Sequence, residues 1–201
     1  MFQDPGRVSL LVINQQGLAT GVQSNGSVIT TIPLSFYYPS AANPAAVLLN
    51  TPSGAFRIIV TGIEAGGFTL AVSTENMATH SIKEATANGT ISPGSSLVYD
   101  AMISAGPQGI VLTLEANPIA SLTLEINFLT AADMDKGTKN SLLVKLQNAQ
   151  EHLSTGHKNV SNELSALIHE AEALPSQKLP PDIKTTLIGW TTDVIGQLGA
   201  N

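Results

Sequence analysis

The 201-residue sequence contains no cysteine, which excludes disulfide bonds, thiol nucleophiles and thiolate metal sites. Charged residues make up only 12% of the chain, about half the share found in an average soluble domain. Lysine and arginine number nine and the net charge is −6, which argues against a surface that neutralises nucleic-acid phosphates. The longest apolar run, residues 8–13, is far too short to cross a bilayer. We therefore expect neither a nucleic-acid partner nor a membrane span.

Charge and aromatic content divide the chain near residue 130. Residues 1–130 carry three basic and seven acidic residues, whereas residues 131–201 carry six and eight in about half the length. Eight of the nine aromatic residues precede residue 130, and only Trp190 follows it. Such a shift marks a domain boundary. The sequence predicts a first domain over 1–130, a polar linker over 131–137 (AADMDKG) and a second domain over 138–201.

The first domain has the pattern of an all-β fold. Its short runs are rich in β-branched and aromatic residues, and several alternate between two faces, as half-buried strands do. Turn pairs such as Asn25-Gly26, Asn88-Gly89 and Pro93-Gly94 separate these runs. Such spacing favours an antiparallel immunoglobulin-like β-sandwich. The predicted strands cover residues 7–14, 55–61, 67–74, 96–103 and 122–128.

The second domain changes to a helical period. Apolar residues recur every three or four positions over 142–153, 160–174 and 183–198, each of which draws one stripe along a helix. Breaks at Thr155-Gly156 and Pro180-Pro181 separate the three stripes. Three helices with short connections should close as an antiparallel bundle, with Trp190 in its core. The predicted class is therefore α+β in two parts, a β-sandwich followed by a C-terminal three-helix bundle.

No established catalytic motif occurs in the sequence, neither a nucleophile elbow nor a phosphate-binding loop nor a paired zinc-binding histidine motif. Glu115 and Glu125 sit in repeated Thr-Leu-Glu frames, and paired acids can cleave glycosidic bonds when they lie close together. Alternation places Glu125 on the solvent face of a predicted strand, which favours two solvated carboxylates. His80 lies between Thr79 and Ser81 and fits a solvated position better than a catalytic base. His152 and His157 flank a predicted loop, where surface placement is favoured over a metal pair.

Asp133 and Asp135 alternate in the linker ahead of Gly137, which is similar to the start of a calcium-binding loop. The similarity ends there, because an EF-hand loop counted from Asp133 needs further ligands where Gly137 and Val144 stand. A polar hinge is therefore favoured over a calcium site, and no cofactor is predicted.

Phe36, Tyr37 and Tyr38 form the one aromatic cluster of the sequence, framed by Pro33 and Pro39. Adjacent aromatic rings on a loop can stack on sugars or insert into a partner. In a strand, however, neighbouring residues point to opposite faces, so at least one of the three is expected in the core.

The first domain contains five segments with a recognisable pattern: LVINQQGLATG (11–21) with ITTIP (29–33), SGAFRIIVTG (53–62), GGFTLAV (66–72) and GTISPG (89–94). Together they resemble accessory β-domains of large secreted or surface proteins, often bacterial. Comparable strands follow von Willebrand A-type adhesive domains in some surface proteins. NSLLVKL (140–146) and LSALIH (164–169) look like helices at the C-termini of such proteins. The chain departs from the pattern at Asn14-Gln15, where Asp-Pro is usual, which puts any metal or turn role of that aspartate in doubt.

The resemblance implies a non-catalytic extracellular module, attached to a hydrolase or adhesive domain, that acts as a scaffold or in adhesion. Its partner would be a neighbouring domain of a larger protein, or a surface polymer or protein. The alternative is a module that binds a glycan or cell-wall polymer through Phe36, Tyr37 and Tyr38. A third class is a small hydrolase that uses Glu115 and Glu125, or His80.

Overall fold

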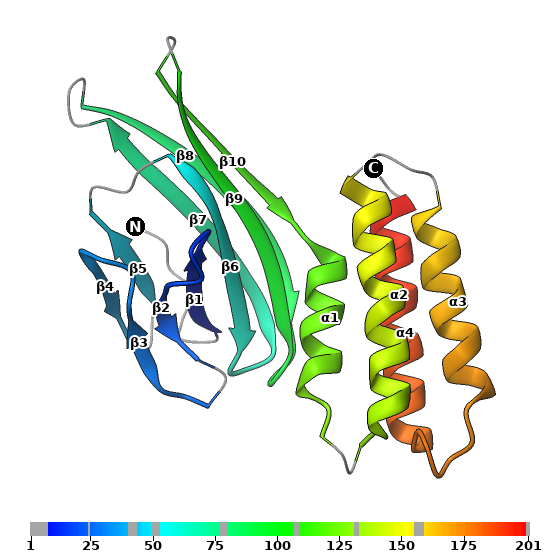
Figure 1. Cartoon of the computed structure of the whole chain (residues 1–201). Coiled ribbons are helices and arrows are strands. Elements are labelled where there is room, and N and C mark those ends of the chain that lie inside the picture. The colour runs from blue at the N-terminus through cyan, green and yellow to red at the C-terminus, as the bar shows by residue number, and fades with distance from the viewer. Residues whose placement is uncertain are drawn as a thin grey trace. The chain divides into compact units, whose positions relative to one another are not determined.

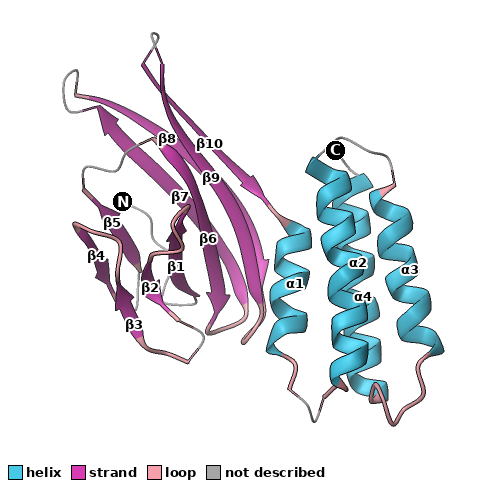
Figure 2. Cartoon of the chain, viewed as in Figure 1, coloured by secondary structure: helices cyan, strands magenta, loops and turns pink. Residues whose placement is uncertain are grey.

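The computed structural model describes residues 8–23, 25–39, 44–49, 53–76, 80–106, 109–130, 133–154 and 159–199. The chain divides into two compact units, Met1–Asn117 and Pro118–Asn201, here called the strand unit and the helical unit. Figure 2 shows strands in the first and helices in the second. The prediction of an α+β protein in two parts is confirmed. The boundary predicted after residue 130 falls inside the helical unit, between its first two helices.

All strand pairs in the described part of the strand unit are antiparallel. Six strands form one sheet in the order β10-β9-β6-β1-β2-β3, and the hairpins β4-β5 and β7-β8 form two small sheets (Figure 1). Three sheets of this kind do not make a clear two-sheet sandwich, so that finer prediction is not met. The strands are β1 Val8–Asn14, β2 Ala19–Val22, β3 Val28–Thr30, β4 Ser35–Tyr38, β5 Ala45–Leu48, β6 Gly54–Gly62, β7 Gly66–Asn76, β8 Ser81–Ile91, β9 Ser96–Gly106 and β10 Gly109–Ala116.

The core of the strand unit follows the period of two that its sequence predicts. Phe56, Ile58 and Val60 of β6 point to the same face of the sheet and are all buried. They belong to one cluster with Phe68 of β7 and Tyr99 of β9, whose rings meet edge to face with centroids 6.3 Å apart. The β7-β8 hairpin is thereby packed onto residues of the six-stranded sheet.

The helical unit has four helices in the described residues, one more than predicted: α1 Pro118–Phe128, α2 Lys136–Ser154, α3 Val160–Ala173 and α4 Pro181–Gly199. The strand predicted over 122–128 is wrong, because this segment is the larger part of α1. Its buried side chains Ile119, Leu122 and Ile126 are spaced by three and four residues, which is helical spacing. Of the predicted linker, Lys136 and Gly137 belong to α2, and residues 131–132 lie outside the described residues.

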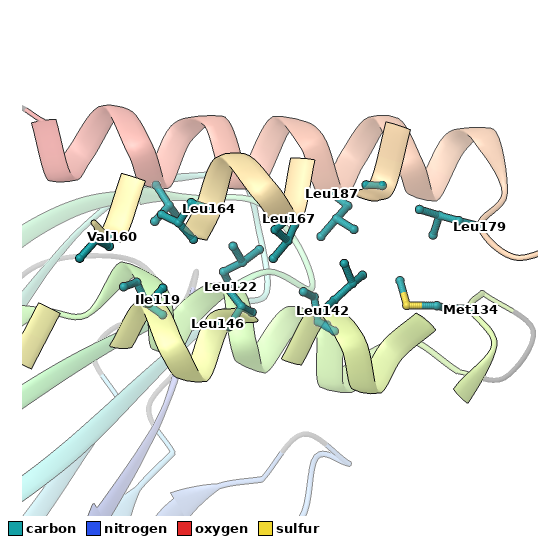
Figure 3. Packing of buried hydrophobic residues seen from close by; sticks show 14 residues of the cluster. Ile119, Leu122, Met134, Leu142, Leu146, Val160, Leu164, Leu167, Leu179 and Leu187 are labelled. Atoms are coloured by element: carbon teal, nitrogen blue, oxygen red, sulfur yellow. The ribbon is translucent and has the colours of Figure 1, made fainter. Parts of the chain in front are cut away.

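The four helices share one apolar core. Consecutive helices contact each other and α4 contacts α1, so the set closes on itself (Figure 1). Figure 3 shows the side chains of this core meeting between the helices, with Leu122, Leu146 and Leu167 among them. Trp190 of α4, predicted in the core, is only partly buried and packs against the cluster from outside it. No helix of the described residues is long and apolar enough to span a membrane.

The two helical hairpins, α1-α2 and α3-α4, are each closed by a lysine that donates hydrogen bonds to two carbonyls at the end of the preceding helix. The Nζ of Lys139 donates to the carbonyl oxygens of Asn127 and Leu129, each at 2.7 Å, at the end of α1. The Nζ of Lys184 donates to the carbonyls of Glu172 and Leu174 at 3.1 and 2.6 Å, at the end of α3. In both hairpins the acceptors lie 12 and 10 residues before the lysine. A cation at a helix C-terminus satisfies carbonyls that the helix leaves open and complements its dipole.

Candidate functional site

The aromatic cluster lies in strand β4, which separates its three rings. Phe36 and Tyr38 point outward, with 46% and 57% of their surfaces exposed. Tyr37 points to the opposite face, where burial raises the pKa of its phenol against the opposing effect of a hydrogen bond with the backbone of Leu10. Tyr37 is half-buried and does not belong to the core cluster of the strand unit, so the expected core ring turns inward only in part. Two rings are left on the surface.

The outward rings belong to a larger apolar face on the β4-β5 hairpin. Val47 of β5 is the register partner of Phe36 and is 38% exposed. Leu34 and Leu49, 60% and 49% exposed, lie just beyond the two strands at the end of the hairpin, where the Leu49 N–H donates to the Leu34 carbonyl at 2.9 Å. Arg57 is the one charged residue between positions 8 and 62 of the sequence. We call this five-residue surface the apolar face: Leu34, Phe36, Tyr38, Val47 and Leu49.

A hollow of about 400 Å³ adjoins the apolar face, and Leu34 and Leu49 belong to both. This volume lies within the range of small-molecule sites. Its wall is mainly apolar, and its polar members are amides, a serine and backbone; among the described residues that line it, none is charged. The lining residues are Asn14, Gln15, Gln16, Leu18, Ile32, Pro33, Leu34, Leu49, Ser53, Gly54, Ala55 and Phe56.

The polar side of the hollow is the tight turn between β1 and β2. The Oδ1 of Asn14 accepts hydrogen bonds from the backbone N–H groups of Gln16 and Leu18, at 3.0 and 2.9 Å. Gly17 takes a φ of 76°, which glycine adopts without strain. The Asn14 side chain thus fixes this turn. The exposed residues Gln15 and Gln16 line the hollow, and the hydrogen bonds to Asn14 fix the backbone of their turn.

Leu34 is held in a conformation that leucine rarely takes. Its φ is 54°, in the left-handed region, which costs an L-residue about 1–2 kcal/mol relative to glycine. The neighbouring contacts keep it there: the Ser35 hydroxyl donates to the Ile32 carbonyl at 2.6 Å, and the Leu34 carbonyl is bonded to Leu49. Pro33 fixes the preceding φ. Strained positions of this kind cluster at functional sites, and this one carries an exposed apolar side chain.

The predicted acidic site residues serve local structure. Asp133 accepts hydrogen bonds from the backbone and hydroxyl of Thr130 at 2.7 and 2.8 Å, and these bonds lower the pKa of its carboxyl. Asp135 precedes α2 and accepts from the hydroxyl and backbone of Thr138 and from Gly137 N, so its pKa is also lowered. It is the N-terminal cap of α2. Within the described ranges, no three His, Asp or Glu side chains gather as a metal site would require.

The other candidates for chemistry are dispersed. Glu115 is exposed on β10, whereas Glu125 belongs to α1, so the solvent-facing strand assumed for Glu125 is wrong. His80 is exposed in the turn before β8, with Nδ1 3.3 Å from the Glu75 carboxylate. His152 of α2 lies 4.0 Å from Glu163 of α3, and the predicted metal partner His157 lies outside the described residues.

Sequence reasoning found two members of the apolar face, Phe36 and Tyr38, and missed the other three. Leu34 precedes strand β4 in a left-handed conformation, so the alternation of the strand does not predict its position. Val47 and Leu49 come from the partner strand, and only the register of the hairpin brings them to the same face. Only the fold brings Gln15 and Gln16 of the β1-β2 turn close to Leu34 and Leu49, so no local sequence pattern predicts that they line the same hollow.

No protein-family model, no curated protein and no solved structure matches the chain. The resemblance to accessory modules of surface proteins therefore stays a prediction.

Proposed function

We propose that this chain is a non-catalytic adhesion module of a larger extracellular protein, which attaches to a surface polymer through the apolar face. The observation that carries the proposal is the exposure of Phe36 and Tyr38 beside three exposed aliphatic side chains on one charge-free hairpin. Single exposed apolar residues are ordinary, but a contiguous group marks an interaction surface. Aromatic rings contribute most to such surfaces, because they bury a large area at little conformational cost.

A pull-down with insoluble cellulose, chitin and peptidoglycan tests this proposal. The Phe36→Ser/Tyr38→Ser double variant should lose retention on the polymer that holds the wild-type chain. Ile82→Ser is the matched control, because Ile82 is 66% exposed on β8, outside the apolar face. Circular dichroism confirms that each variant is folded. Equal retention of the double variant and the wild type, or no retention of the wild type on any polymer, would contradict the proposal.

The extracellular location is supported by the low charge of the chain and by the segments that resemble secreted proteins. An immunoblot of the source culture, with cells and medium separated, tests it. We expect a band well above 20.9 kDa in the medium or surface fraction. A band near 20.9 kDa inside the cells would refute both the location and the larger parent protein.

A second candidate is a scaffold role, in which the same face packs against a neighbouring domain of the parent protein. The observation that favours it is the aliphatic character of Leu34, Val47 and Leu49, since aliphatic surface suits a protein interface. Hydrogen exchange distinguishes the two roles. Amides of β4 and β5 exchange more slowly in the parent protein than in this chain if a domain covers the face, and equally fast if it is free for a polymer.

A further inference from the structure

The hollow beside the apolar face has the chemistry of a site for a neutral, hydroxyl-rich ligand. None of the described residues that line it is charged, so an ionic ligand would lose its hydration and gain no counter-charge from them. The wall formed by Leu18, Ile32 and Leu34 offers apolar contact, while Gln15 and Gln16 at the rim carry amide donors and acceptors. A purely apolar ligand would leave those amides without new partners. A pyranose ring presents an apolar C–H face and a rim of hydroxyl groups, which matches both sides.

Leu34 connects the hollow to the apolar face, and its backbone favours a different residue. At a φ of 54° glycine is free of the strain that leucine bears. The leucine side chain is 60% exposed, so it adds little to the core in return. Leu34 is strained, its apolar side chain is exposed on the wall of the hollow, and two exposed aromatic rings lie next to it. A contact between this side chain and a ligand would account for these features.

We propose that this hollow binds one neutral sugar ring of the polymer, with Leu34 packed on the ring and the amides of Gln15 and Gln16 bonded to its hydroxyl groups. Phe36 and Tyr38 then stack on the neighbouring rings of the same chain. The inference rests on the proposed adhesion function and names the ligand class of its surface.

Titration of the 201-residue protein with cellotetraose, chitotetraose and maltotetraose, followed by NMR and calorimetry, tests the site. At least one oligosaccharide should shift the backbone amide signals of Gln15, Gln16, Leu34 and Leu49. Leu34→Gly should weaken its binding about tenfold, because the apolar contact is lost, and should raise the melting temperature, because the strain is relieved. Ile63→Gly is the matched control, since Ile63 is an exposed aliphatic residue of another turn and should leave binding unchanged.

Further variants keep the test decisive. Gln15→Ala and Gln16→Ala should each weaken binding about fivefold without a change in melting temperature. If Leu34→Gly fails to fold, Leu34→Asn replaces it, because asparagine tolerates the left-handed region. The site is refuted if no oligosaccharide shifts these signals, or if the Leu34 and glutamine variants bind as tightly as the wild type.

The failure of this site and the failure of the proposed function are distinguishable. If Phe36→Ser/Tyr38→Ser abolishes polymer retention while Leu34→Gly leaves it intact, adhesion stands and the sugar site in the hollow falls. If no polymer retains the wild type, both fall. A neutral capped tetrapeptide, acetyl-Ala-Ala-Pro-Ala-amide, is the probe for the competing ligand class. Shifts at the same signals with the peptide but with none of the sugars would overturn the assignment to carbohydrate.

Discussion

Gly89 of β8 offers the sharpest test of how the strand unit is packed. It is the register partner of Phe68, whose ring lies over it and meets Tyr99 edge to face with an interplanar angle of 84°. A Cβ added at Gly89 would lie 2.7 Å from two carbons of the Phe68 ring and 3.1 Å from the Tyr99 hydroxyl. The ring has to move, and with it the contact that ties the β7-β8 hairpin to β9.

We expect Gly89→Ala to lower the free energy of unfolding of the strand unit by about 1–3 kcal/mol, the usual cost of overpacking a core. Gly67→Ala is the control in the same hairpin, because its Cβ would meet nothing closer than 3.8 Å. Removing a strand glycine there should stabilise the unit by up to about 1 kcal/mol. The sign of the change should therefore differ between two identical substitutions.

Chemical denaturation can follow the two units separately. All three tyrosines lie in the strand unit and the single tryptophan lies in the helical unit. In Gly89→Ala, the transition followed by the near-ultraviolet tyrosine signal should have its midpoint at a lower denaturant concentration than in the wild type. The transition followed by Trp190 fluorescence should keep the wild-type midpoint. Phe68→Leu combined with Gly89→Ala should recover part of the loss, since the smaller side chain makes room. Equal stability of Gly89→Ala and Gly67→Ala would refute the packing argument.

Four further outcomes are expected. Gly21→Ala should lower the free energy of unfolding of the strand unit by about 3 kcal/mol or more, because its Cβ would lie 2.1 Å from the Leu10 carbonyl oxygen at a φ of 136°. Gly26→Ala, at positive φ in open space, should lower it by about 1 kcal/mol in the same denaturation experiment. Lys184→Met should destabilise the helical unit by about 1 kcal/mol in Trp190 fluorescence. Asp135→Ala should lower the melting temperature of that unit. Because the folded pKa of Asp135 is lowered, its stabilisation is complete above the ordinary value near 3.8 and fades as pH falls through the folded value, so melting curves of the variant should lose part of the wild-type acid dependence. Calcium should leave the melting temperature unchanged, because the carboxylate oxygens of this turn already accept local hydrogen bonds.

The sequence was most informative where one period dominates. Alternation located strands β7 and β9, and runs rich in β-branched and aromatic residues located β1 and β6, apart from Arg7, which lies outside the described residues. Three apolar stripes located α2, α3 and α4. The same reasoning gave the wrong result for the segment 118–128, because its apolar residues fit both the spacing of two typical of a strand and the spacing of three to four typical of a helix. Leu122, Leu124, Ile126 and Phe128 alternate, while Ile119, Leu122 and Ile126 follow a helical spacing. Pro118, suited to the first turn of a helix, was the local signal that separates the two interpretations.

The helical unit shows why a fourth helix was needed. Lys139 and Lys184 bond the ends of the preceding helices at the same sequence spacing, so α1-α2 and α3-α4 are two similar hairpins. With α1 assigned to the sheet, α2 would lack its hairpin partner and Lys139 would lack its two acceptors. The contact of α1 with α4 closes the set and buries Ile119, Leu122 and Ile126. A bundle that ends at three helices would leave these side chains exposed to water.

The candidate site could be predicted only in part, because its aromatic residues follow a local strand pattern whereas its hollow depends on contacts between segments far apart in the sequence. The aromatic residues of β4 are visible in the sequence, and the pleat of any strand sends Phe36 and Tyr38 to one face. The hollow depends on contacts between the Asn14–Leu18 turn and the end of the β4-β5 hairpin, which no local pattern encodes. The strain at Leu34 is equally invisible, since nothing in Pro33-Leu34 alone sets the sign of φ. The sequence can indicate the aromatic rings of such a surface, but only the fold shows the hollow beside them, whose described lining is uncharged and for which we propose a neutral sugar.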